Sequence, residues 1–153
     1  MTHFDEKAGI VQATTPWGSW SQTMDEIVIE VNVEDGTRGR DVTCDIKPSQ
    51  ITLNVKGKTI LKGELFRTVI ADDSVWTIED QRLVRLTLVK SSRHVKTCWE
   101  ALLKDQYALD AITLQNMQKK MALEKYQRQH PGFDFSGADV TGNYVDGGAP
   151  DDY

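Results

Sequence analysis

Residues 74–90 read SVWTIEDQRLVRLTLVK, and this stretch decides the fold class. Its second half alternates apolar and polar side chains, the apolar ones being Val84, Leu86 and Leu88. Successive side chains of a β-strand point to opposite faces of the sheet, so this alternation predicts a half-buried strand. We expect Arg85 and Thr87 to face solvent. Asp80 and Gln81 form a tight turn, which makes the whole stretch a β-hairpin.

The same alternation recurs upstream about every ten residues, the spacing typical of an all-β domain. The predicted strands are Ile27–Val33, Val42–Ile46, Ile51–Val55, Thr59–Phe66 and Val69–Ile78. Turn residues such as Gly36 and Gly57 separate them, because glycine adopts a positive φ at little cost. No helical pattern lies between these segments, so the sequence predicts an antiparallel β-sandwich rather than a parallel α/β sheet.

The chain changes character after Lys90. The apolar segment Thr97–Lys104 is expected to pack back on the sandwich. Helix formers dominate from Asp110 to Gln129, and either Asp110 or Thr113 caps the start of this predicted helix. Its apolar stripe consists of Leu114, Met117 and Met121, spaced i, i+3 and i+7. This stripe either covers the sandwich or meets a second copy of the chain in a homodimer.

We divide the chain into four parts: an N-terminal segment (1–14), the sandwich (15–104), a helix with an aromatic motif (105–137) and a flexible tail (138–153). No period is sustained through the first 18 residues, where Thr15–Gly18 predicts an extended entry turn. The sequence His130-Pro131-Gly132 ends the helix, because proline disfavours helical dihedral angles at the residue before it. The last part is rich in glycine and aspartate, which predicts disorder.

Composition narrows the class of partner. The 153 residues suit one compact domain with appendages, and 39% of them are hydrophobic. A net charge of −5 argues against general nucleic-acid binding, which needs a basic face to release counterions. No apolar run approaches the ~20 residues that span a bilayer, and no secretory segment follows Met1, so we expect a cytoplasmic protein without a membrane partner. The two cysteines are then reduced thiols.

Catalytic chemistry has little support in the sequence. The histidines are scattered at His3, His94 and His130, and none lies in a setting typical of an active site. A pair formed by His94 and Cys98 would share one face of a helix, but a buried cysteine beside a solvated histidine is the favoured interpretation. No spacing of metal ligands and no glycine-rich phosphate loop is present. We expect no enzyme, no metal and no cofactor.

The candidate contacts for a protein partner lie next to the turn of the predicted hairpin. An aromatic ring lies beside two carboxylates there, although such a tryptophan more often packs across strands and acidic turns are usually solvated. Lysines near another turn offer the opposite charge. The candidate partner-binding residues are therefore Trp76, Glu79, Asp80, Lys56, Lys58 and Lys62.

Four segments carry a family resemblance. Trp17–Thr23 leading into Glu26–Val31 resembles the opening of a CS domain, the sandwich shared by NudC proteins and small heat-shock co-chaperones. Ile60–Leu65, Ser74–Asp80 and Tyr126–Gly137 resemble the NudC branch of that family. The resemblance covers nearly the whole chain, with four motifs in the family's order.

The resemblance implies a CS sandwich of seven to eight strands and a co-chaperone role. It implies cooperation with the ninety-kilodalton heat-shock chaperone and stabilisation of β-propeller clients, among them the lissencephaly protein, a regulator of the dynein motor. It also implies association with centrosomes, spindle and kinetochores beside a cytosolic pool. The alternative hypothesis is a structural adaptor of the dynein and microtubule machinery without chaperone activity.

Overall fold

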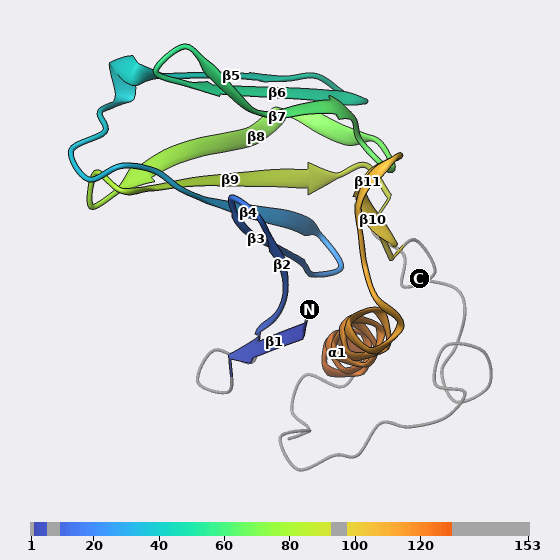
Figure 1. Cartoon of the computed structure of the whole chain (residues 1–153). Helices are drawn as coiled ribbons and strands as arrows, with labels where there is room; N and C mark the ends of the chain where they lie inside the picture. The colour runs from blue at the N-terminus through green and yellow to red at the C-terminus, as the bar shows by residue number, and fades with distance from the viewer. Residues whose placement is uncertain (1, 6–9, 93–97, 130–153) are drawn as a thin grey trace.

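The computed structural model describes residues 2–5, 10–92 and 98–129 as layered β-sheets with one helix beside them (Figure 1). One antiparallel sheet has the strand order β1-β2-β3-β4-β9-β8, and a second has the order β5-β6-β7. The strands of the first sheet are β1 (Thr2–Asp5), β2 (Ile10–Thr15), β3 (Gly18–Gln22), β4 (Glu26–Asn32), β8 (Val69–Glu79) and β9 (Leu83–Lys90). The second sheet contains β5 (Val42–Ile46), β6 (Gln50–Val55) and β7 (Lys58–Glu64), preceded by the short 3-10 helix η1 (Gly39–Asp41).

The predicted all-β sandwich with a C-terminal helix is confirmed, and seven strands, β3 to β9, form its body. The apolar side chains of the predicted strands face inward. On β4 and β9 these side chains are fully buried, namely Ile27, Ile29, Val31, Val84, Leu86 and Leu88. The register pairs Ile29 with Leu86, which places the two apolar rows side by side. Burial of this shared face is the main source of stability.

Both predicted hairpin turns are present. Asp80 and Gln81 have φ values of 54° and 56°, and Lys56 and Gly57 have values of 53° and 78°. Two successive positive φ angles are typical of a type I′ turn, whose twist matches that of the flanking strands. The Arg82 amide closes the first turn by donating to the carbonyl of Glu79 at 3.1 Å.

The entry to the sandwich differs from the prediction. Thr15–Gly18 is not an extended entry turn, because Thr15 pairs with Gly18 and the segment forms a tight hairpin between β2 and β3. Gly18 has a φ of 156°, and a Cβ there would lie 2.0 Å from the Glu30 carbonyl oxygen. The close approach of β3 to β4 therefore requires glycine. Strands β1 and β2 before this hairpin were not predicted.

The segment that was predicted to pack back on the sandwich is here called the return segment. Its described part, residues 98–104, does pack there. Cys98, Trp99, Leu102 and Leu103 are buried. Strand β10 (Ala101–Leu103) pairs with β11 (Gln106–Ala108) and also reaches β7, because the Lys104 amide donates to the Glu64 carbonyl at 3.0 Å. The C-terminal end of β7 is thus covered by the chain itself.

Helix α1 (Ala111–Gln129) confirms the predicted helix and lies against β1 and β2 (Figure 1). Asp110 caps its start, since the Thr113 amide donates to the Asp110 carboxylate at 3.3 Å. Met117 and Met121 are 1% and 0% exposed and join the common core, while Leu114 is half-buried. The stripe therefore covers the chain's own strands, the first of the two alternatives.

Within the described ranges, no helix has both the length and the apolarity needed to cross a membrane. The predicted helix stop at His130-Pro131-Gly132, the aromatic motif that follows it, the tail and His94 lie outside the described residues.

Candidate functional site

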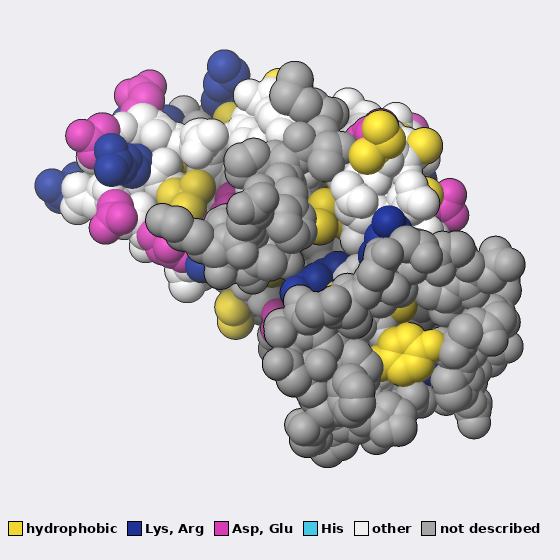
Figure 2. All heavy atoms as spheres, turned by 90° about the horizontal axis from the view of Figure 1, so that it is seen from below, with side chains coloured by type: hydrophobic (Ala, Val, Ile, Leu, Met, Phe, Trp, Pro, Cys, Tyr) yellow, Lys and Arg dark blue, Asp and Glu magenta, His cyan; other side chains and the backbone are white. Residues whose placement is uncertain are grey.

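The candidate residues predicted from the sequence lie mostly at one end of the sandwich, here called the hairpin end. The turns at Lys56 and at Asp80 both lie there (Figure 1). Residues 34–41 link the turns: the Thr37 amide donates to the Gln81 carbonyl at 3.0 Å, and the Lys56 amide donates to the Asp41 carbonyl at 2.7 Å. Lysine, arginine and acidic side chains intermingle at this end, so it carries no single sign of charge (Figure 2).

The six candidates are only partly brought together. Lys58 begins β7 at the hairpin end, whereas Lys62 lies farther along that strand, and both are exposed. Lys56 Nζ is 3.4 Å from Glu34 Oε2, an exposed ion pair of small energetic value. Asp80 is exposed in its turn. The end can therefore offer exposed charges of both signs to a partner.

Glu79 belongs to a network on the outer face of the sheet. Arg85 Nη1 is 3.2 Å from Glu79 Oε2, and Arg85 Nη2 is 2.6 Å from Glu30 Oε2. Gln12 Nε2 donates to the second oxygen of Glu30 at 3.2 Å. Arg85 and Thr87 lie on this outer face, as expected, but both are half-buried there. Carboxylates on the two flanking strands hold the arginine against the sheet.

Trp76 packs at an incompletely covered edge of the core. Strands β5 and β8 are the outermost strands of their sheets on this side and lie next to each other, and no backbone ladder joins them in the described ranges. Apart from the buried Val42 and Val69, their inward side chains are only half-buried, and we call this group of four the open seam: Cys44, Ile46, Trp76 and Ile78. Burial raises the pKa of the Cys44 thiol to about 11, so it stays neutral. The seam is an apolar surface next to an unpaired strand.

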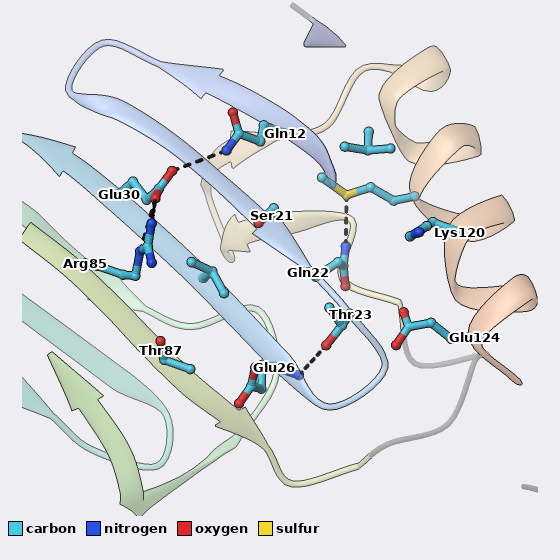
Figure 3. A pocket seen from close by; sticks show the side chains of 13 residues that line it. Gln12, Ser21, Gln22, Thr23, Glu26, Glu30, Arg85, Thr87, Lys120 and Glu124 are labelled. Carbon is cyan, nitrogen blue, oxygen red and sulfur yellow. Dashed lines mark hydrogen bonds and ion pairs between the residues drawn. The ribbon is translucent and has the colours of Figure 1, made fainter. Parts of the chain in front are cut away.

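A second hollow lies between the sheet and α1 (Figure 3). This groove has a volume of about 510 Å³. Its lining mixes charges and small side chains from β2, β3, β4, β9 and α1, including Gln12, Ser21, Glu26, Glu30, Arg85, Thr87, Lys120 and Glu124. The strongest contacts there are the Glu30–Arg85 pair and its bond from Gln12.

A buried amide fastens the floor of this groove. Gln22 Oε1 accepts hydrogen bonds from Lys90 Nζ and from the Trp99 amide, both at 2.9 Å. Gln22 Nε2 donates to the Trp99 carbonyl at 2.8 Å and to Met117 Sδ at 3.3 Å. One side chain thereby joins β3 to β9, to the return segment and to α1. Burial lowers the pKa of Lys90, which is 1% exposed, to about 8.

The thiol considered for catalysis has no sign of activation. Cys98 is 6% exposed, and burial raises its pKa to about 11. A nucleophilic cysteine needs a lowered pKa and access to solvent, and Cys98 has neither. Among the residues that the structure describes, no group of three His, Cys, Asp or Glu side chains is placed to hold a metal ion.

Sequence reasoning missed Gln12, Gln22 and Glu30. Glu30 stands on the polar phase of a predicted strand, but its partner Arg85 is 55 residues away and the strand pairing was unknown. Gln22 lies in a segment without a predicted strand, where a polar residue reads as exposed. The one sequence signal for this network was a carboxylate and an arginine on the polar faces of two predicted strands.

These features define a CS-domain protein: an antiparallel sandwich of seven strands whose short extensions cover one side. The family model described as "CS domain" matches residues 16–90, which run from the β2–β3 turn to the end of β9. The CS domain of human KIAA1068 protein, known as a solution structure, has a TM-score of 0.57 with this chain. It covers 65% of this chain and 82% of that one at 21% identity, a likeness that shows the fold alone.

Relatives whose match extends beyond the CS domain specify the branch of the family. NudC domain-containing protein 2 of Homo sapiens is 47% identical over 145 residues, which are 95% of this chain and 92% of that protein. Nuclear migration protein nudC of Drosophila melanogaster is 28% identical over 154 residues, covering 77% of this chain and 46% of that protein. The chain therefore belongs to the NudC family, in the branch of NudC domain-containing protein 2, as its motifs predicted.

Proposed function

We propose that the protein is a non-enzymatic co-chaperone that binds client proteins and stabilises them. The observation that carries this proposal is the 47% identity with human NudC domain-containing protein 2 over 95% of the chain. A likeness that spans sandwich, return segment and helix supports a shared role better than a likeness confined to the CS domain would.

Mass action is the mechanism that we propose. A protein that binds the native or near-native form of a client, and not its unfolded form, shifts the client's folding equilibrium. At a free concentration of 100 times Kd this shift is worth about 2.7 kcal/mol. Covering an exposed strand edge of the client would also block edge-to-edge aggregation. Neither process needs a nucleophile, a metal or a cofactor.

The proposal extends to particular partners. The co-chaperone would act with the ninety-kilodalton heat-shock chaperone on β-propeller clients, in particular the lissencephaly protein, and so reach the dynein complex indirectly. The name of the Drosophila relative refers to nuclear migration, which is in line with a motor pathway. We propose a cytoplasmic location, with part of the protein at centrosomes, spindle and kinetochores.

The proposed client contacts are those at and near the hairpin end: Trp76, Glu79, Asp80, Lys56, Lys58 and Lys62. Trp76 would contribute apolar area through its exposed part, and the exposed lysines and Asp80 would select for charge. Glu79 would act through its pair with Arg85, which holds its carboxylate in place.

An aggregation assay tests the proposal. A heat-labile β-propeller protein is warmed with and without an equimolar amount of this protein, and light scattering is followed. We expect scattering to fall strongly, whereas an unrelated protein at the same concentration should leave it unchanged. Undiminished scattering, together with capture of dynein components from lysate, would favour the alternative, a structural adaptor without chaperone activity.

A further inference from the structure

We propose that the free edge of β8 accepts an extended, positively charged segment of a partner protein as an added β-strand. The inference rests on the proposed function and deepens it, because it gives the chemistry of the segment that the protein would hold. Three independent features of the β8 edge support it: unpaired backbone groups, the open seam and the distribution of acids.

Strand β8 ends its sheet with unpaired backbone. It has 11 residues and pairs on one side with β9. Within the described ranges, residues 75–79 pair with β9, whereas residues 72–74 lie in an irregularity outside that register. At the irregularity between Ile70 and Val75, Ser74 Oγ donates to the Ile70 carbonyl at 2.9 Å and accepts from the Val89 amide at 3.1 Å. The strand is thus well anchored, and its outer backbone is available for pairing.

The open seam supplies an apolar surface beside that edge. Trp76 and Ile78 point inward but remain half-buried, whereas Leu86, opposite Trp76 on β9, is 0% exposed. On the other face Val75 is 56% exposed, one of two large hydrophobic side chains in the described ranges with such exposure. A strand added to β8 would place alternate side chains over the seam and beside Val75. The neighbouring edge strand β5 has only 5 residues and offers a shorter template.

Acids mark both ends of this edge. Asp72 and Asp73 are exposed, and no cation is recorded as their partner in the part of the chain that the structure describes. Glu79 and Asp80 lie at the other end. Antiparallel pairing of two copies along this edge would bring the acids at one end of β8 toward those at the other end, and like charges that face each other across strands are destabilising. The charges disfavour a second copy and favour a partner that carries lysine or arginine.

On the opposite side of the sandwich, the return segment covers the end of β7, through the Leu65–Leu103 bridge and the bond from the Phe66 amide to the Leu102 carbonyl at 3.1 Å. The rest of β7 carries the exposed Lys58 and Lys62, which would repel a basic segment. The edge of β8 therefore combines free backbone, half-buried apolar side chains and exposed carboxylates near both of its ends, and these favour an extended basic segment.

A peptide titration on the full chain tests the inference. The probe is a capped peptide of alternating valine and lysine, and its controls carry glutamate for lysine or N-methyl groups on alternate amides. We expect NMR to show slowed amide exchange in residues 72–78 with the lysine peptide and with neither control. Protection elsewhere, or equal binding of the lysine and glutamate peptides, would overturn the proposal.

A charge variant gives the second readout. Asp72→Asn with Asp73→Asn should weaken peptide binding roughly fivefold, the effect of losing two exposed ion pairs. Glu100→Gln with Asp105→Asn removes the same charge from the β10–β11 region and should leave binding unchanged. Equal weakening by both variants would show that net charge, not this edge, attracts the peptide.

The two proposals can fail separately. In one outcome, the wild type and the Asp72→Asn, Asp73→Asn variant protect a client equally although the variant binds the peptide more weakly. That result would support the co-chaperone function and exclude β8 as its client-binding site. Peptide addition to β8 without protection of any client would retain the strand edge and remove the co-chaperone function.

Discussion

The two sides of the sandwich differ in how far the chain's own segments cover them. On the closed side, which we define as segment 98–109 at the end of β7 together with α1 on β1 and β2, the chain covers its own strands and buries Trp99 and Met117. On the open side, the seam between β5 and β8, a tryptophan of the same size stays half-buried beside an unpaired strand. The chain contributes more than thirty residues to covering the closed side and none of its described ones to the open side.

That difference separates stability from recognition. A covered edge cannot pair with a partner, and a bare edge gains little from the chain's own packing. We therefore expect substitutions on the closed side to lower the free energy of unfolding strongly. Substitutions on the open side should leave the fold intact and change binding.

The double substitution Met117→Glu with Met121→Glu should have the largest effect. It places two carboxylates in sites that are 1% and 0% exposed, so we expect a loss above about 4 kcal/mol or complete undocking of α1. Thermal melts and sedimentation measure this, with Met121→Leu as the volume-matched control. An unchanged melt with an altered sedimentation coefficient would instead place the stripe between copies of the chain.

The two tryptophans compare the sides directly. Trp99→Ala should cost about 4 kcal/mol, because Trp99 is 1% exposed in the core. Trp76→Ala should cost only about 1 to 2 kcal/mol, because part of its ring is already in water. Urea unfolding of both variants gives the two values. Similar losses would mean that the seam is as well packed as the closed side.

Gln22→Ala should cost about 3 kcal/mol. It leaves Lys90 Nζ and both backbone groups of Trp99 without their bonds, and buried polar groups are expensive to leave unpaired. Gln12→Ala is the control, since that half-buried amide makes a single recorded bond, to Glu30. Equal losses in urea unfolding would deny Gln22 its role in fastening three elements together.

Lys90 should make stability depend on pH. Its folded pKa of about 8 lies below its ordinary value of 10.5, so the unfolded chain binds more protons between these values and stability rises with pH there. Relative to Lys90→Met, the wild type should gain about 1 kcal/mol from pH 8 to pH 9.

Both proteins in this comparison carry Cys98→Ala. Burial raises the pKa of the Cys98 thiol and the Lys90 charge opposes that rise, so the loss of Lys90 would change this titration as well. Burial raises the pKa of the Cys44 thiol from 9.0 to about 11, so its contribution to stability falls as pH rises, in both proteins alike. Lys62→Met, at an exposed position, should keep the wild-type dependence. A constant difference between wild type and Lys90→Met across this range would contradict the assignment.

Local signals predicted the body of the sandwich. Alternation in β4 and β9 is long and regular, and the turns at Gly57 and Asp80 interrupt it clearly. Side-chain chemistry alone limited the cap to Asp110 or Thr113, and the structure has Asp110 in that role. These features depend on neighbours within a few residues, which is why a single sequence is enough to find them.

Features that depend on long-range pairing escaped prediction. Strand β2 has six residues, its two large apolar side chains are adjacent rather than alternating, and its burial depends on β3 and α1. The environment of Arg85 depends on a strand 55 residues away, and that of Gln22 on a segment 77 residues away. The open seam exists because no described segment covers β8, a property of the whole fold rather than of any motif.

Amide hydrogen exchange of the full chain with a β-propeller client tests most directly whether the open side holds the partner. Exchange is followed in free protein and in the complex. We predict that β8 and β5 gain protection while β10 and α1 keep the rates of the free protein. Protection of α1 and of the groove between it and the sheet, with β8 unchanged, would contradict the account.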